Sequence, residues 1–327
     1  MTRCILAGAM ALTIAGKAYS AMPNLLLIEG GVHAPISAPN NFFRDGRGVV
    51  ESDYRIAQTE LTTGDWTEFL NAYAPFIENP LFDVGTVGYA HLPHGEDENG
   101  VPIFVNATSS DRTPVLVSWE ASARYCNWLH NDRRTDRDAF ETGVYDTSTF
   151  TTNPDGSPNH QRDPSPGARF WIPTADQWLK AAYFDPDGND GEGRWWNYPN
   201  GSDEPLVIGL PNEGGETNAS IGFDPAPITA FEVDAYDHVQ SAAGLFSVSG
   251  GLSELVAEGN VMGSEAWLLP EIVVPLVDHL HGLSDRYVDP WRAIGTLRLA
   301  AAVPSPSSTA AIAALGLLGS VRRRRCR

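Results

Sequence analysis

Residues 54–73 read YRIAQTELTTGDWTEFLNAY and join an extended segment to a helix. In 62–73, large apolar side chains recur at the three- and four-residue spacing of one helix face, behind a threonine pair whose hydroxyls can cap the first turn. The sequence therefore predicts an extended segment followed at once by a capped amphipathic helix. The apolar face consists of Trp66, Phe69, Leu70 and Tyr73, and the caps are Thr62 and Thr63.

Two later stretches repeat this order of an extended segment and a helix. In LVSWEASARYCNWLH, residues 116–130, Ser118 is the predicted cap. In FWIPTADQWLKAAYF, residues 170–184, Thr174 and Gln177 form a predicted capping box. The predicted inward-facing residues are Trp119, Ala123, Cys126 and Leu129 in the first helix, and Trp178, Ala181 and Ala182 in the second.

The remaining sequence is rich in Gly, Pro, Asn and Asp, as in 153–167 and 211–218. Such composition is typical of long surface loops with short strands between them. Few helices among so many loops favour an irregular α+β domain over an α/β sheet with crossover helices.

Both ends of the chain have the composition of sorting signals. Residues 1–20 combine an early arginine with an apolar run and small residues, which predicts a secretory signal peptide. Residues 303–327 contain a Pro/Ser hinge, a short apolar run and four consecutive arginines, and they resemble a PEP-CTERM sorting tail. The family's Pro-Glu-Pro reads Pro-Ser-Pro here, with Ser305 in place of the glutamate. The remainder, 21–302, is long enough for one large domain.

Charge restricts the partners of this domain. The two terminal segments hold seven of the 22 Lys and Arg residues and no acid, so residues 21–302 carry 15 cations against 41 acids, a net charge of −26. Such a surface repels phosphate backbones, which excludes nucleic acid and anionic membrane as favoured partners.

The order of segments resembles the formylglycine-generating enzyme family, also called sulfatase-modifying factor. The resemblance runs from 54 to 205 through YRIAQTELTTGDWTEFLNA, TPVLVSWEASARYCNWLHN, ETGVYD, ARFWIPTADQWLKAAYFDPDG and WWNYPNGSDEP. It continues faintly to GTLRLAA, residues 295–301, where the family usually has Gly-Phe-Arg-Val-Ala. The resemblance implies a C-type-lectin-like fold with little regular secondary structure. With its tail, the chain resembles the exported branch of this family that ends in PEP-CTERM signals.

Active members use two cysteines after a Gly-Gly-Ser motif to bind copper and oxidise a substrate cysteine with oxygen. Soft thiolate ligands suit Cu(I). Here the counterpart of that motif is Met262-Gly263-Ser264, and no cysteine follows it before residue 302. The only cysteine of the domain is Cys126, on the apolar face of a predicted helix, where we expect an inert packed side chain. We therefore expect no catalytic residue of the family's type and no copper.

The family's calcium-binding stretch is also altered. Its counterpart is AGLFSVSGGLSEL, residues 243–255, in which Gly251 stands at the position of an asparagine ligand. Glu254 is retained and could donate one oxygen, whereas calcium takes six to eight. The sequence therefore allows two alternatives for Glu254: a calcium ligand, or a solvent-facing glutamate that binds no metal.

One aromatic cluster has the composition of a ligand surface. Aromatic faces stack on the CH groups of sugars, and amides and carboxylates bind hydroxyl groups. The alternative is that these aromatic residues belong to the core. The candidate ligand-binding residues are Trp195, Trp196, Tyr198, Asn200 and Asp203.

Two other constellations are weaker. The loop starting at Asp185 lacks the glycine and the glutamate that an EF-hand needs at its sixth and twelfth positions. Residues 278–281, DHLH, have no identifiable distant ligand.

The sequence thus predicts an exported, non-catalytic domain that binds a polysaccharide or another envelope or matrix component. A sorting protease would act on its tail, which would anchor it transiently in the membrane. The alternatives are an enzyme of the same fold that uses other residues, such as a metal-dependent oxidase or oxygenase, and a purely structural envelope protein.

Overall fold

The computed structural model describes residues 21–37, 46–77, 91–154, 158–219, 231–259, 261–262 and 294–304. The predicted signal peptide, the tail from residue 305 onward, Gly263, Ser264 and the DHLH stretch lie outside these ranges. Our expectations for those segments stay predictions.

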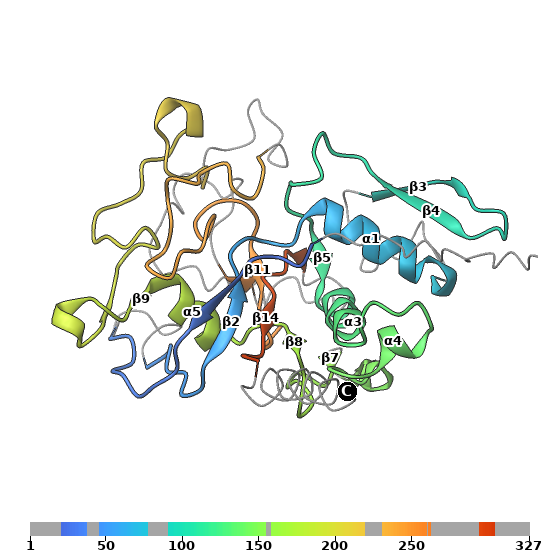
Figure 1. Cartoon of the computed structure of the whole chain (residues 1–327), viewed down its shortest axis with the longest axis horizontal. Helices are drawn as coiled ribbons and strands as arrows, with labels where there is room; N and C mark the ends of the chain where they lie inside the picture. Colours follow the sequence, from blue (N-terminus) through green and yellow to red (C-terminus); the bar gives the residue numbers. More distant parts are fainter. Residues whose placement is uncertain are drawn as a thin grey trace, which may run out of the picture.

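A four-stranded antiparallel sheet lies at the centre of the molecule (Figure 1). Its order is β1 (Leu25–Ile28), β2 (Tyr54–Ala57), β14 (Ala300–Ala301) and β8 (Phe170–Trp171). Ile56 of β2 lies opposite Leu26 on one side and Ala300 on the other. The sheet therefore joins the first and last described segments of the chain.

Three helices lie on one side of this sheet in Figure 1: α1 (Thr63–Tyr73), α3 (Trp119–His130) and α4 (Asp138–Glu141). The predicted caps of α1 and α3 are confirmed. The side chain of Thr62 accepts a hydrogen bond from the Asp65 N–H at 3.2 Å, and that of Ser118 accepts one from Ala121 N–H at 3.1 Å. Helix α4 was not predicted, because four residues are too short to show a helical period.

Helix α5 (Ala175–Tyr183) lies on the other side of the sheet (Figure 1). Its capping box is confirmed: Gln177 N–H donates to Thr174 Oγ1 at 3.1 Å, and Thr174 N–H donates to Gln177 Oε1 at 3.0 Å. Its inward residues Trp178, Ala181 and Ala182 are buried, as predicted.

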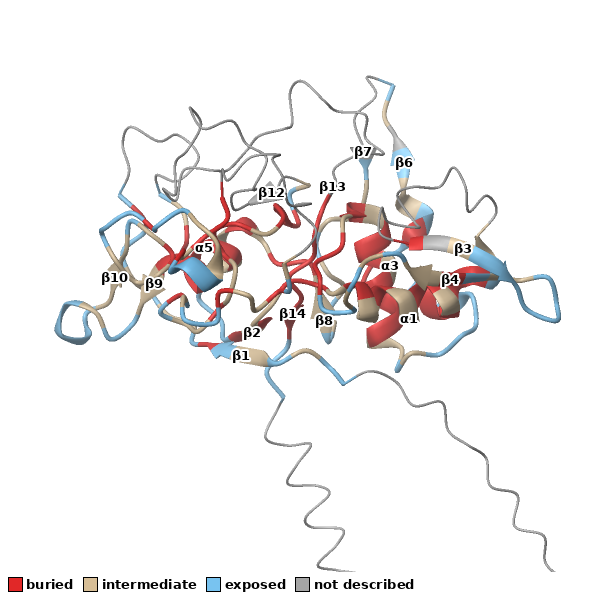
Figure 2. Ribbon diagram, turned by 90° about the horizontal axis from the view of Figure 1, so that it is seen from above, coloured by how far each residue is buried: buried red, intermediate tan, exposed pale blue. Residues whose placement is uncertain are grey.

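The core has two parts. The larger part gathers around α1, α3 and α4, and the smaller part around α5 and the first strands, while Trp171 packs against both. Figure 2 shows the buried residues concentrated in these helices and the strands between them, with exposed loops around them. We predicted eight inward-facing residues in α1 and α3. Seven of them are under 5% exposed, and the eighth, Tyr73, is 7% exposed.

Within the described ranges the other strands form five short antiparallel pairs, and four single turns are 3₁₀ helices. The predicted irregular α+β fold is thus confirmed. No helix in the described ranges combines the length and apolar content that crossing a bilayer requires. The pairs are β3 (His91–Glu96) with β4 (Pro102–Asn106), β5 (Val117–Ser118) with β13 (Ile294–Gly295), β6 (Thr151–Thr152) with β7 (Pro158–Asn159), β9 (Phe184–Asp185) with β10 (Arg194–Trp195), and β11 (Glu254–Leu255) with β12 (Val261–Met262); the 3₁₀ helices are η1 (Ala74–Phe76), η2 (Thr147–Thr149), η3 (Asn189–Gly191) and η4 (Pro211–Glu213).

Candidate functional site

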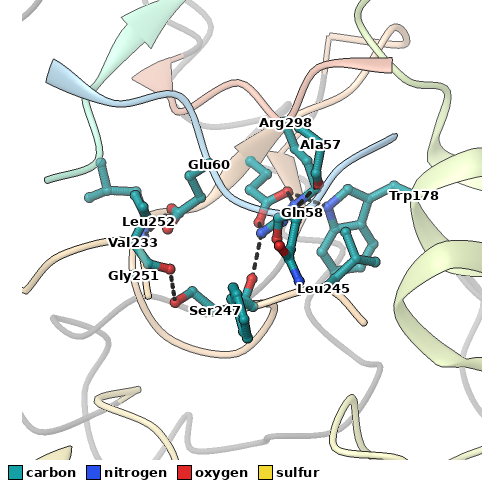
Figure 3. A network of polar contacts seen from close by, with 12 residues as sticks. Ala57, Gln58, Glu60, Trp178, Val233, Leu245, Ser247, Gly251, Leu252 and Arg298 are labelled. Atoms are coloured by element: carbon teal, nitrogen blue, oxygen red, sulfur yellow. Dashed lines mark hydrogen bonds and ion pairs between the residues drawn. The ribbon is translucent and has the colours of Figure 1, made fainter. Parts of the chain in front are cut away.

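A buried guanidinium joins the end of β2 to the strand β11. Arg298, which is 1% exposed, donates through Nε to Glu254 Oε2 at 2.7 Å and through Nη2 to Glu254 Oε1 at 2.6 Å. Its other donors bind main-chain carbonyls, as Figure 3 shows. All five N–H groups of the guanidinium thereby have an acceptor. The carbonyls are those of Ala57 at 3.2 Å, Gln58 at 2.6 Å and Phe246 at 2.8 Å.

Helix α5 completes the surroundings of Glu254. Trp178 Nε1 donates to Glu254 Oε2 at 2.6 Å, so both carboxylate oxygens accept short hydrogen bonds. Burial by itself lowers the pKa of Arg298, but the charge and hydrogen bonds of Glu254, together with the charge of Glu60, raise that pKa above its ordinary value. These hydrogen bonds cross-link the sheet, α5 and β11.

A second carboxyl group, Glu60, lies in the same cluster (Figure 3). Its Oε1 accepts a hydrogen bond from Leu252 N–H at 3.0 Å, and its Oε2 is buried with no partner among the described residues. Burial raises the pKa of Glu60 to about 8, and the charge of Glu254 adds to the rise, while Arg298 and the Leu252 N–H oppose it. Because Arg298 already has a full set of acceptors, the second carboxyl group is most stable when protonated.

Gly251, at the position where the resemblance implies an asparagine, has little room for a side chain. Gly251 has φ +65°, and a Cβ there would lie 2.7 Å from Glu60 Oε2. Its N–H donates to Asn218 Oδ1 at 2.9 Å. Glu60 therefore occupies the space that a side chain at residue 251 would need.

This donor set does not suit calcium. The alternative of a solvent-facing Glu254 is wrong, because the side chain is 1% exposed. Both of its oxygens are engaged, and a cation beside them would meet the guanidinium of Arg298. The described residues contain no group of three or more His, Cys, Asp or Glu side chains arranged to hold a metal ion.

The predicted aromatic residues lie in and after β10, but their rings have different neighbours. Trp195 stacks on His33, with ring centroids 5.6 Å apart, and packs against Phe184 at 5.0 Å. Its Nε1 donates to Ala34 O at 2.9 Å. Trp195 is half-buried and belongs to the edge of the smaller core.

Trp196 lies under a cation. The guanidinium carbon of Arg194 is 3.6 Å from the centroid of its ring, and Trp196 Nε1 donates to Asp185 Oδ2 at 3.2 Å. Arg194 also donates to Asp203 Oδ2 at 2.6 Å. The structure thus brings Trp196 and Asp203 together through Arg194, which sequence reasoning missed.

Tyr198 and Asn200 lie in the turn that follows. Tyr198 N–H donates to Ser202 O at 3.0 Å, and Asn200 Oδ1 is buried without a partner among the described residues. Pro199, between them, lines a small pocket. The other residues that line this pocket are Leu206, Glu216, Tyr236, Val239, Leu245, Ser247, Val248 and Ser249.

The ligand-contact role of the five predicted residues stays a prediction.

Cys126 lies in the larger core and is 0% exposed. Burial raises the pKa of its thiol far above its ordinary value. The interpretation of this cysteine as a packed side chain is therefore confirmed. The domain offers no second thiol, so its residues do not fit the copper centre that the resemblance implies.

The functional candidates that sequence reasoning missed are Glu60, Trp178 and Arg298. One signal was available for Arg298: it stands between Leu297 and Leu299 in an apolar segment, and all three residues are buried. A charged residue within an apolar strand needs a buried partner. Nothing in the sequence identified Glu254 as that partner.

Comparison with known proteins agrees with this architecture. The family model described as the sulfatase-modifying factor enzyme 1-like domain matches residues 13–265. No curated protein shows significant sequence similarity to the chain. The crystal structure of CarF is similar in fold, with a TM-score of 0.50 at 14% identity, over 86% of this chain and 99% of that one. Variable protein 1 of Treponema denticola gives a TM-score of 0.41 at 14% identity, over 85% and 95% of the two chains.

Proposed function

The chain belongs to the sulfatase-modifying factor enzyme 1-like domain family, and on this premise we propose that it is an exported, non-catalytic member that binds a component of the cell envelope or extracellular matrix. The observation that supports the absence of the family's catalysis is the number and burial of the cysteine thiols. The only cysteine between the two terminal segments is Cys126, which is sealed in the core.

Copper-dependent oxidation of a cysteine needs soft ligands that are accessible to metal and substrate. Cys126 has neither a second thiol nor an open path to solvent in the structure. We expect purified protein to leave a Cys-x-Pro-x-Arg peptide unchanged, with or without Cu(I). Mass spectrometry of the peptide, against a control without protein, measures this. Conversion to formylglycine above that control would contradict the proposal.

The proposed ligand is a polysaccharide or another uncharged or basic matrix component. The net charge of −26 on residues 21–302 disfavours polyanions such as nucleic acid. Arg194 of β10, the following Trp196 and Asp203 of the next turn bring an aromatic ring, donors and acceptors together. This combination is the kind of surface that binds sugar rings, and it supports the proposal.

Co-sedimentation with cellulose, a neutral polysaccharide, tests this surface, with DNA as the negatively charged comparison. We expect Trp196→Ala to reduce binding to cellulose. Val207→Ala is the matched control, because it also shortens an apolar surface side chain; Val207 is 56% exposed. This variant should bind as the unmodified protein does. Equal binding by both variants would remove Trp196 from the ligand surface.

Export and tail processing rest on the two terminal segments. The signal peptide directs the chain to the secretory route, and the apolar run before the arginines holds it in the membrane until a sorting protease cuts at the hinge. Cell fractionation followed by the mass of the mature chain tests both steps. An intact arginine terminus on soluble extracellular protein would contradict tail cleavage, and a full-length cytoplasmic chain would contradict export.

A further inference from the structure

The segment 31–37 covers one of the predicted ligand residues. The His33 ring stacks on Trp195 at an interplanar angle of 28° and meets the Phe184 ring edge-on, with centroids 4.2 Å apart. The next residue, Ala34, accepts the indole N–H of Trp195 at 2.9 Å. His33 and Ala34 therefore occupy a face and the only hydrogen-bond donor of that indole.

Main-chain hydrogen bonds hold this segment in place. Gly31 N–H donates to Val50 O at 3.1 Å, and Ile36 N–H donates to Arg47 O at 3.0 Å. The Arg47 side chain in turn binds Asp176 of α5 at 2.8 Å. Gly46 N–H donates back to Ile36 O at 3.0 Å, and the Ile36 side chain is buried in the smaller core. The segment is therefore anchored at both ends, while Ala34 and Pro35 between them are exposed.

A glycine lets the neighbouring chain approach the indole. Gly48 has φ +90°, and a Cβ on it would overlap the ring of Trp195. Its N–H donates to Asp176 Oδ1 at 2.8 Å. The closed arrangement therefore places the main chain directly against the edge of Trp195.

His33 is the residue of this segment whose protonation would destabilise the closed arrangement. Both of its ring nitrogens are shielded from solvent and have no hydrogen-bond partner among the described residues. Lys180 of α5 is the charged group that acts on it, and Phe184 and Trp195 of β9 and β10 are neutral. Burial first, and then the charge of Lys180, lower the pKa of His33.

Protonation of His33 would place a second positive charge near Lys180, with two ring N–H donors and no acceptor. Lys180 Nζ is fixed by Val50 O at 3.3 Å and lies 5.7 Å from the centre of the Phe184 ring. Glu29, which follows β1, and Asp53, which precedes β2, act on Lys180. The stacked position of His33 therefore favours the neutral imidazole over the protonated ring.

We propose that residues 31–37 form a closed cover over Trp195, and that acidification releases this cover by protonating His33 and frees the indole to stack on a sugar ring. The ligand in this inference rests on the proposed function, whereas the release of the cover does not. The inference assigns Trp195 a ligand surface that is closed at neutral pH and open at acidic pH.

Acrylamide quenching of tryptophan fluorescence measures the release directly, on the mature protein without ligand. The Trp195 contribution is the difference between the unmodified protein and Trp195→Phe. We expect its quenching constant to rise between about pH 7.5 and about pH 5, with circular dichroism confirming that the fold is retained. In His33→Phe, which keeps the stacking but cannot be protonated, the rise should be lost. His94→Phe, at an exposed histidine of β3, is the matched control and should keep it.

A pH-independent Trp195 contribution, or a rise that persists in His33→Phe, would overturn the proposal. If His33→Phe fails to fold, Lys180→Met provides a second test, because removing the neighbouring charge should shift the midpoint of the rise toward higher pH. Cellulose binding measured over the same pH range separates the two ideas. Release without binding contradicts the sugar ligand alone, and binding that increases as Trp195 is released supports both.

Discussion

Glu254 holds Arg298 through two hydrogen bonds of 2.6 and 2.7 Å, and both side chains are 1% exposed. The pair joins strands and a helix that are remote in sequence. Removing one partner of a buried pair lowers the stability of the fold far more than removing one partner of an exposed pair. The reason is that the remaining buried charge has no water to solvate it.

Arg298→Met should therefore destabilise the domain strongly. We expect a loss on the order of 3 to 5 kcal/mol in the free energy of unfolding, since Glu254 stays buried without its cation. Arg194→Met is the matched control, because the Arg194–Asp203 pair is substantially exposed and should contribute only about 1 kcal/mol or less. Urea unfolding followed by circular dichroism measures both variants. Similar losses in the two would contradict the assignment of Arg298 as a buried cross-link.

Glu60 should make stability depend on pH. Its pKa is raised from an ordinary 4.5 to about 8 in the folded protein, so the folded state holds the proton more tightly than the unfolded state. The stabilising effect of this proton is fully present below the unfolded-state pKa and is lost as the pH rises to about 8. The free energy of unfolding should therefore fall across this window, by up to about 1.4 kcal/mol per pH unit.

Glu60→Gln keeps the shape of the side chain and removes its titration. We expect the fall in stability between about pH 5 and about pH 8 to become shallower in this variant, which should be the more stable protein at the alkaline end. Urea unfolding at several pH values gives both slopes. Parallel slopes would show that Glu60 does not bind the proton.

The helices could be predicted because their determinants are local. Each cap side chain accepts a hydrogen bond from the N–H group three residues later. The apolar residues of each helix face recur within two turns. Helix α4 was missed because its single turn contains no period. Local patterns therefore account for the principal helices and for the general class of the fold.

The buried cluster could not be predicted because its contacts are remote in sequence. Glu254 and Arg298 are 44 residues apart, and Glu60 and Leu252 are 192 residues apart. Each carboxyl group looks like a surface residue until the strands β2, β11 and the last segment meet. The interpretation of Trp195 and Trp196 as one surface failed to anticipate His33 for the same reason, whereas Arg194 is adjacent in sequence and its position over Trp196 depends on side-chain geometry.

Cys126 should behave as a small apolar side chain. In the native protein we expect no reaction with iodoacetamide, because the thiol is buried and its pKa is raised. Cys126→Ala should cost about 1 to 2 kcal/mol, the effect of a small cavity, and should leave binding to cellulose unchanged. Mass spectrometry of native and denatured samples measures the labelling. Rapid modification of the native protein would show that the thiol is accessible.

Gly251→Asn restores the residue type of the family's ligand position and should nevertheless destabilise the domain. Asn tolerates a positive φ better than most residues, so the main cost comes from the overlap between its side chain and Glu60 Oε2. Gly214→Asn is the matched control: Gly214 has φ +85° and nothing within 4 Å of its Cβ position. We expect the substitution at residue 251 to cost about 1 to 3 kcal/mol more than that at residue 214.

Glu60→Ala in the same chain should relieve that overlap, so the double variant should lose less than the sum of the two single losses. The free energies of unfolding of the four proteins in this cycle measure the coupling. Additive losses would show that Glu60 does not limit the size of residue 251. Stabilisation of Gly251→Asn by millimolar calcium, absent from Gly214→Asn, would instead show that one substitution rebuilds a cation site at Glu254, against the geometry described above.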